Sequence, residues 1–151
     1  MTLSAGNVTR MVASYSYDDI GRLISLKRSG NVGMVNYAYN IRNWLNETKS
    51  DRFSQNLWYE TTGAYPCFNG NISRLQWQSG KDHVLRGYDF AYDGLNRLEE
   101  STYAEGEDMS QNKNRYSENI LSYSPNGSIE RLQRYGKKNN GTFGLIDDLT
   151  Y

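Results

Sequence analysis

The nine residues YSYDDIGRL, at positions 15–23, decide the fold because the same pattern returns along the chain. Two tyrosines two positions apart are followed by an acidic residue, a glycine, an arginine and a leucine. Related stretches are YAYNIRNWL at 37–45 and FAYDGLNRL at 90–98, and weaker copies end at Leu75 and Leu132. A pattern that repeats in this way indicates a structural unit rather than a single active site.

Each copy has the features of a β-hairpin. Residues i and i+2 of a strand point to the same face, so the paired aromatic side chains lie on one side of a sheet. The Asp, Asn and Gly residues that follow favour tight turns, because Asp and Asn bond their own backbone and Gly adopts positive φ. A second strand then leaves the turn, as in RLISLKR at 22–28. Such a hairpin cannot bury its aromatic face alone and must pair with the next one.

The composition agrees with an all-β protein. The chain has 151 residues, with 13 Tyr, 4 Phe, 3 Trp and 14 Gly but only 2 Pro, and its mean hydropathy is -0.80. Aromatic residues favour strands, while Gly and Asn favour turns. The 17 basic and 17 acidic residues balance, so no long-range field attracts nucleic acid. No membrane span and no signal peptide are expected in this chain.

We therefore predict an all-β fold in which an antiparallel meander of β-hairpins forms a curved, partly open sheet. The polar stretches 49–56 and 104–119 are expected to be surface insertions. A single array of about five hairpin repeats is expected over residues 1–151, with approximate limits at 13–36, 37–64, 65–87, 88–115 and 116–151.

The stretches YSYDDIGRLISLKR, YAYNIRNWLNE and RGYDFAYDGLNRLEESTYAEG resemble the YD repeats of the rearrangement-hotspot (Rhs) family, and the resemblance covers about residues 13–151. The family motif runs approximately Tyr, any, Tyr, Asp, two any, Gly, Arg, Leu. The second copy has Asn40, Asn43 and Trp44 where the motif has Asp, Gly and Arg, and the fourth has Asn96 for Gly. The third and fifth copies depart further.

The resemblance implies a ribbon-like sheet that spirals into a hollow shell, as in cell-envelope proteins of bacteria of the Bacteroides kind. Such shells often enclose a toxic C-terminal segment. This chain has too few repeats to close a shell, so it is expected to be a segment of the wall rather than a complete toxin-delivery protein. The same resemblance implies a secreted or cell-surface location.

The residues assigned to the repeat are expected to have structural roles as aromatic pairs, turn residues, arginines and inward leucines. The third copy contributes the degenerate aromatic pair Tyr65 and Phe68. The arginine before each leucine is expected to pair with turn carboxylates or to stack on aromatic rings. The assigned residues are Tyr15, Tyr17, Asp18, Gly21, Arg22, Leu23, Tyr37, Tyr39, Asn40, Leu45, Asn69, Gly70, Arg74, Leu75, Phe90, Tyr92, Asp93, Arg97, Leu98, Tyr123, Asn126, Gly127, Arg131 and Leu132.

No catalytic, metal or cofactor site is predicted. Asp18 and Asp19 lie in a turn, where Asp is favoured for backbone reasons. Glu99 and Glu100 are neighbours on a strand and are expected to face opposite sides, which argues against a carboxylate pair that cleaves glycosides. His83 is the single histidine, so a site with two histidine ligands is excluded.

Two functions of different classes follow. The favoured one is a non-enzymatic structural module that self-associates through strand edges or pairs with further repeats, or with an enclosed toxin segment, of a longer parent protein. The alternative is a carbohydrate- or cell-wall-binding module in which exposed aromatic rings stack on a glycan. The candidate glycan-stacking residues are Trp44, Trp58, Tyr59 and Trp77.

Overall fold

The computed structural model of the chain describes residues 2–5, 8–29, 33–61 and 65–151, which form β-strands and no helix. The strands are β1 (Thr2–Ala5), β2 (Val8–Met11), β3 (Ala13–Tyr17), β4 (Leu23–Arg28), β5 (Met34–Tyr39), β6 (Leu45–Lys49), β7 (Phe53–Trp58), β8 (Arg74–Ser79), β9 (Leu85–Tyr92), β10 (Leu98–Glu105), β11 (Glu118–Tyr123), β12 (Ile129–Lys137) and β13 (Phe143–Thr150).

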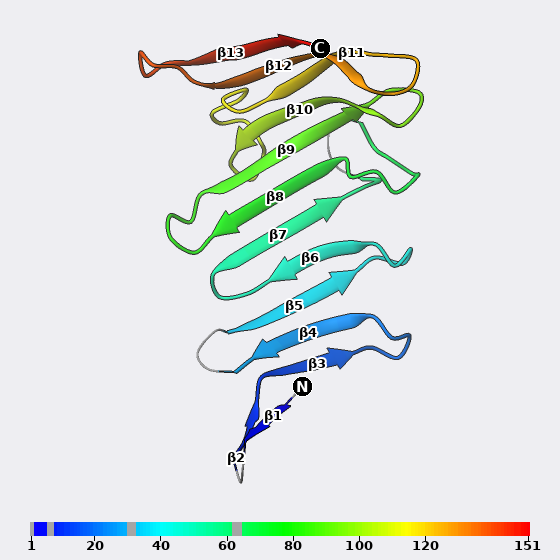
Figure 1. Cartoon of the computed structure of the whole chain (residues 1–151), viewed down its shortest axis with the longest axis vertical. Helices are drawn as coiled ribbons and strands as arrows, with labels where there is room; N and C mark the ends of the chain where they lie inside the picture. The colour runs from blue at the N-terminus through cyan, green and yellow to red at the C-terminus, as the bar shows by residue number, and fades with distance from the viewer. Residues whose placement is uncertain (1, 6–7, 30–32, 62–64) are drawn as a thin grey trace. The chain divides into compact units, whose positions relative to one another are not determined.

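The strands follow one another in a meander. β1 and β2 form a separate two-stranded hairpin, and the other strands form an 11-stranded sheet in chain order, with β3 and β13 as its edges (Figure 1). Every register that the structure describes between neighbouring strands is antiparallel. The predicted all-β meander of hairpins in an open sheet is therefore confirmed.

The chain divides into two compact units. Unit 1 comprises Met1–Asn56 and Gln78–His83, and unit 2 comprises Leu57–Trp77 and Val84–Tyr151. The limit expected between the second and third repeats, at residue 64, lies outside the described residues. β7 and β8 are neighbours in the sheet, so the third hairpin begins before that limit.

Four hairpins share one register. The second tyrosine pairs with the residue six positions later, and the next residue of the second strand is left without a partner as a β-bulge. The pairs are Tyr17 with Leu23, Tyr39 with Leu45, Tyr92 with Leu98 and Tyr123 with Ile129.

A five-residue turn closes each of these hairpins. In the turn Asp18–Arg22, the N–H of Asp18 donates to the carbonyl of Arg22 and the N–H of Gly21 donates to the carbonyl of Asp18, both at 3.0 Å. The fourth turn residue has positive φ, which Gly and Asn tolerate best. The fourth residues, including that of the β12–β13 turn, are Gly21, Asn43, Asn96, Gly127 and Gly141.

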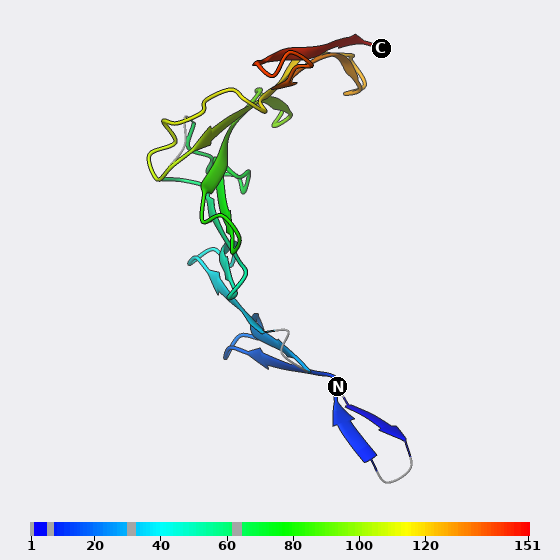
Figure 2. The same ribbon diagram turned by 90° about the vertical axis from the view of Figure 1, so that its left-hand side faces the viewer.

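The core of unit 2 includes a segment that the sequence suggested was a surface insertion. Residues 106–117, between β10 and β11, stand to one side of β9 and β10 (Figure 2). Within this segment Met109 is only 3% exposed and Ser117 is buried. The Oγ of Ser117 accepts the N–H of Tyr103 at 2.9 Å. Most residues of 106–117 are exposed, as predicted for a surface insertion, but the predicted range 104–119 also includes the ends of β10 and β11, and Met109 and Ser117 are buried.

The insertion predicted over 49–56 is wrong. The strand β7 begins at Phe53, and a short turn after β6 is closed by the N–H of Ser50, which donates to the carbonyl of Phe53 at 2.8 Å. The polar residues Ser54, Gln55 and Asn56 hid this strand because they pair with the equally polar β6, where Asn56 lies opposite Glu47.

Aromatic rings pack together on unit 2, but few of them belong to the repeat pattern. Trp77 stacks on Tyr88 with ring centroids 5.8 Å apart, and Tyr103, which is 2% exposed, meets Tyr88 edge to face at 5.4 Å. Phe90 contributes from the pattern, stacked on Tyr88 at 6.1 Å. Rings at these distances attract one another beyond the area that they bury.

Candidate functional site

The turn aspartate and the arginine four residues later form one hydrogen-bonded unit. The Oδ1 of Asp18 accepts the N–H groups of Ile20 at 3.1 Å and Arg22 at 2.8 Å, while its Oδ2 accepts Nε of Arg22 at 2.6 Å. The fourth copy repeats this arrangement, with Oδ2 of Asp93 2.6 Å from Nε of Arg97. The prediction that the arginine pairs with a turn carboxylate is confirmed in both copies.

The second tyrosine of a repeat reaches back to the hairpin before it, a contact that we call the tyrosine clasp. The hydroxyl of Tyr39 donates to the backbone carbonyl of Leu23 at 3.0 Å, and the guanidinium of Arg22 lies 4.9 Å from the centre of the Tyr39 ring. The clasp therefore joins the turn of one repeat to the strand of the next. The other clasps join the hydroxyl of Tyr92 to the carbonyl of Ile72 at 2.9 Å and the hydroxyl of Tyr123 to the carbonyl of Leu98.

Ring stacking accompanies the clasp where an arginine is present. The guanidinium of Arg97 lies 4.3 Å from the centre of the Tyr123 ring, so the expected arginine stacking is confirmed. In the second copy Trp44 takes the arginine position, and Arg42 from the same turn lies 5.3 Å from the centre of its ring. Cation–π contacts of this kind contribute about 0.5 to 1 kcal/mol when exposed.

The asparagines that replace the motif glycine connect successive turns. Asn43 and Asn96 have φ of 65° and 64°, and Asn is one of the few residues with a side chain that adopts this conformation. The Oδ1 of Asn43 accepts Nη1 of Arg22 at 2.7 Å, and the Oδ1 of Asn96 accepts Nδ2 of Asn69 at 2.5 Å. Each asparagine thus binds the turn of the preceding repeat, which a glycine cannot do.

The third and fifth copies are aligned differently from the sequence-based prediction. Ile129 pairs with Tyr123, and Ile72 accepts the clasp of Tyr92, so these isoleucines take the places expected for Leu132 and Leu75. The assignment of both leucines was wrong by three residues. The error arose because the similar runs NISRL and SIERL place an Arg-Leu pair just beyond the true position.

The arginines of these two copies consequently lie on strands and not in turns. Nε of Arg74 on β8 is 2.5 Å from Oδ1 of Asp89 on β9, and Nη2 of Arg131 on β12 is 2.9 Å from Oδ2 of Asp148 on β13. They pair with carboxylates of the neighbouring strand, so the expected turn partner is wrong for both. Asn126 and Gly127 do lie in a turn, as do Asn69 and Gly70, whose φ is 99°.

The turn carboxylates are held in their charged form. The backbone N–H of Arg97, together with its guanidinium and the N–H of Leu95, lowers the pKa of Asp93 below its ordinary value. Burial acts to raise the pKa of Asp18, but hydrogen bonds from Arg22 and Ile20 outweigh it and the pKa is lowered. A carboxylate with these properties accepts hydrogen bonds and is a poor general acid near neutral pH.

The first aromatic pair is exposed, contrary to the expectation that it forms part of a core. Tyr15 and Tyr17 are 48% and 58% exposed. They lie on β3, an edge strand of the sheet, and Tyr17 makes no clasp to another described residue. Tyr37 in the second copy is half-buried. Burial of the pair therefore depends on a neighbouring hairpin.

The four candidate glycan-stacking residues are largely covered. Tyr59 is buried, and Trp44, Trp58 and Trp77 are partly buried. Trp77 packs against Tyr88, as described above. No row of solvent-facing tryptophan rings occurs among the described residues.

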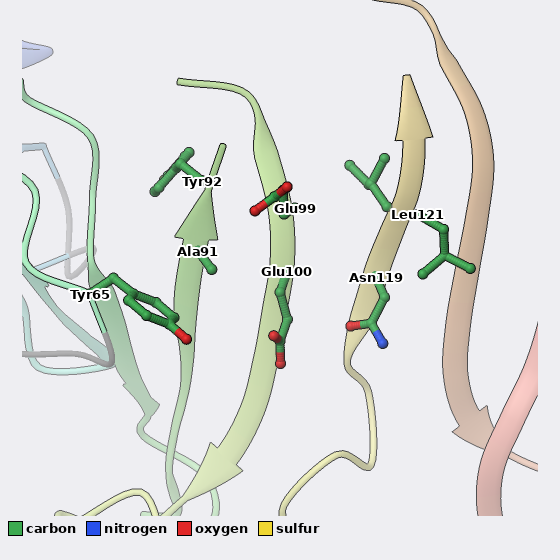
Figure 3. Close-up of a pocket in the computed structure, with 8 residues that line it drawn as sticks. Tyr65, Ala91, Tyr92, Glu99, Glu100, Asn119 and Leu121 are labelled. Atoms are coloured by element: carbon green, nitrogen blue, oxygen red, sulfur yellow. The ribbon is translucent and has the colours of Figure 1, made fainter. Parts of the chain in front are cut away.

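A groove that we call the Tyr65 groove lies on unit 2. Tyr65 and Phe68 belong to the connection between β7 and β8 and not to a strand, which corrects their assignment as a strand pair, and Tyr65 is 61% exposed. The ring of Tyr65 points toward β9 and β10 (Figure 3). The groove has a volume of about 460 Å³ and is lined by Tyr65, Ala91, Tyr92, Glu99, Glu100, Asn119, Ile120 and Leu121.

Both glutamates that follow Leu98 line this groove, so the expectation that they face opposite sides is wrong. The bulge is the reason: Leu98 pairs with Tyr92 and Glu100 with Ala91, which leaves Glu99 without a partner in the ladder. A bulge breaks the alternation of side chains. The same bulge follows the second tyrosine in the other three hairpins, but it is seen only in the strand pairing and not in the sequence.

No cluster of side chains in the described ranges suggests a metal site. Groups of three or more His, Cys, Asp or Glu residues that could hold a metal ion are absent from them. They also contain no helix long and apolar enough to cross a membrane. His83 lies in the turn between β8 and β9 with φ of 54°, and its carbonyl accepts Nε2 of Gln78 at 2.5 Å.

Comparison with known proteins adds no assignment. No protein-family model matches the sequence, and the search of curated proteins found no match.

Proposed function

We propose that this chain is a non-enzymatic structural module whose hairpins are built to join further hairpins of the same kind. The tyrosine clasp is the observation that carries this proposal. The second tyrosines of three copies bond the hairpin before them. The turn aspartates and arginines are likewise occupied by intramolecular contacts, so the repeated polar residues serve the sheet and are not free for a substrate.

The resemblance to YD repeats suggests the larger setting of this module. In a longer Rhs-type protein it would form a segment of the shell wall, and its partners would be neighbouring repeats or an enclosed toxin segment. A secreted or cell-surface protein of bacteria is the corresponding location. Antibody labelling of intact cells that make the protein tests this location, because a protein of the cell interior would be labelled only after the cells are opened.

Self-association through strand edges belongs to the same proposal. β3 and β13 each have one neighbour in the sheet, so one side of each presents backbone donors and acceptors. The net charge is zero, which removes the repulsion that would keep copies apart. Light scattering behind a sizing column should show mass rising with concentration. A constant mass of 17.4 kDa over a wide concentration range would count against it.

The alternative, in which Trp44, Trp58, Tyr59 and Trp77 stack on a glycan, has weaker support. Tyr59 is buried and Trp77 is engaged by Tyr88. Stacking on a sugar requires an open ring face. Exchange of Trp44 or Trp58 for Ala is therefore expected to lower the free energy of unfolding. A loss of glycan binding without a change in stability would favour the alternative.

A further inference from the structure

The Tyr65 groove differs from the clasps because several of its polar groups have no partner. Within the described residues, neither Glu99 nor Glu100 forms an ion pair, and Glu100 accepts a hydrogen bond from the hydroxyl of Thr102. The Oδ1 of Asn119 is buried and accepts no hydrogen bond from a described residue. An unpaired buried acceptor is costly, and a ligand that donates a hydrogen bond would remove that cost.

A second hollow adjoins the same ring. It has a volume of about 480 Å³, and Tyr65, Phe68 and Asn71 are among its lining residues. The Nδ2 of Asn71 is buried and donates to no described residue. Phe68 is also exposed. The Tyr65 ring therefore lies between two hollows that contain unpaired polar atoms, with the carboxylates of Glu99 and Glu100 beside it.

We propose that the Tyr65 groove binds a saccharide that is neutral or carries an amino group. A sugar hydroxyl both donates and accepts, which suits hollows lined by the carboxylates of Glu99 and Glu100 and by the amides of Asn119 and Asn71. The C–H face of a sugar ring packs on an exposed aromatic ring such as Tyr65. Glu99 and Glu100 accept hydrogen bonds from hydroxyl or ammonium groups and repel acidic sugars.

This site is separate from the four residues considered above and does not depend on the proposed structural role. Tyr65 is exposed, and it lies outside the strands and the clasps. Its replacement should therefore leave the fold intact. The negative charge of Glu99 and Glu100 also predicts a preference among saccharides, because it favours neutral and amino sugars over acidic ones.

Isothermal titration of the full chain with three trisaccharides tests the proposal. The probes are cellotriose, a glucosamine trimer and a galacturonic acid trimer, each added near neutral pH. Binding of cellotriose or the glucosamine trimer is expected, and the acidic trimer should bind at least about tenfold more weakly. Absence of binding by both cellotriose and the glucosamine trimer, or preference for the acidic trimer, would overturn the proposal.

Matched variants locate the site. Tyr65→Ala should weaken binding about tenfold or more, while Tyr15→Ala, which removes a comparably exposed ring from unit 1, should leave it unchanged. Glu99→Gln combined with Glu100→Gln should reduce the discrimination against the acidic trimer. Binding that survives Tyr65→Ala at full strength would place the saccharide elsewhere and refute the site. Circular dichroism of each variant confirms that it is folded.

Discussion

At the scale of single residues, the hydroxyl of the second tyrosine has a role that its ring does not, because it bonds the hairpin before it. Phenylalanine at position 39 keeps the ring beside Arg22 but removes the donor to the Leu23 carbonyl. We expect Tyr39→Phe to lower the free energy of unfolding by about 0.5 to 1.5 kcal/mol, the usual net value of a hydrogen bond. Urea titration followed by circular dichroism measures the change.

The first copy provides the control for this substitution. Tyr17 has the same position in its hairpin but makes no clasp to a described residue and is largely exposed. Tyr17→Phe should therefore leave stability unchanged. Equal destabilisation by the two substitutions would show that the tyrosine clasp is not what stabilises the hairpin pair.

The turn carboxylates predict a dependence of stability on pH. Because the folded pKa of Asp93 lies below its ordinary value of 3.8, its contribution to the free energy of unfolding is present above pH ~4 and is lost as the pH falls through the folded pKa. Asp93→Asn should retain the turn, because Asn40 already accepts the N–H groups at the equivalent positions of its own turn, those of Arg42 and Trp44. The variant loses the ion pair with Arg97.

Thermal unfolding at neutral and at acid pH checks this sign. Wild type should be the more stable protein at neutral pH, and the difference from Asp93→Asn should shrink below pH ~3. Other carboxyl groups titrate in both proteins, so the difference between them is the informative quantity. A difference that stays constant from neutral to acid pH would contradict the assigned role of the Asp93 charge.

At the scale of elements, the packing of residues 106–117 on the sheet depends on a glycine in β9. A Cβ added at Gly87 would lie 2.6 Å from the carbonyl oxygen of Leu75 and 2.7 Å from Sδ of Met109. Gly87→Ala should therefore destabilise unit 2 by about 1 to 3 kcal/mol, the range for overpacking. Gly94→Ala is the matched control, because its Cβ would meet nothing within 4 Å. Urea unfolding of the two variants should separate them, and equal stability would argue against close packing at Gly87.

The hairpins could be predicted from sequence because their causes are local. A turn such as Asp18–Arg22 is specified by an acceptor at its first position and a residue that tolerates positive φ at its fourth. The predicted pairing of Arg22 and Arg97 with turn carboxylates follows from the same short spacing. These elements needed no knowledge of distant residues.

The features that could not be predicted depend on distant contacts or on a single added residue. Met109 is buried because Gly87, far away in sequence, leaves room for it. Glu99 lines the Tyr65 groove because it is the bulge residue of β10, and the bulge breaks the alternation that would place it on the face opposite to Glu100. In the fifth copy, either Ile129 or Leu132 of the run SIERL can be aligned with the last position of the motif. The pairing of Tyr123 with Ile129 in the sheet identifies Ile129 as the correct one.

At the scale of the whole molecule, the two units differ in how much they bury. Among the described residues, buried side chains such as Tyr103, Met109 and Gln76 belong to unit 2, whereas Ala13 is the buried residue of unit 1. Local stability follows burial. The amide of Tyr103 should therefore exchange with solvent deuterium about tenfold or more slowly than that of Tyr15. Hydrogen exchange followed by NMR measures both rates, and equal protection would contradict the expected difference.

The acceptor of the tyrosine clasp is a backbone carbonyl, a group that every amino acid possesses. Leu23, Ile72 and Leu98 serve equally well in this role. A hairpin that carries the tyrosine can consequently follow any other hairpin, whatever side chain its predecessor presents at that position. Genes built from such units can be lengthened, shortened or shuffled by recombination between copies. The encoded protein then retains the tyrosine clasps between neighbouring hairpins. The connections can then differ in length and sequence without loss of the scaffold, and the long connection between β7 and β8 is an example within this chain.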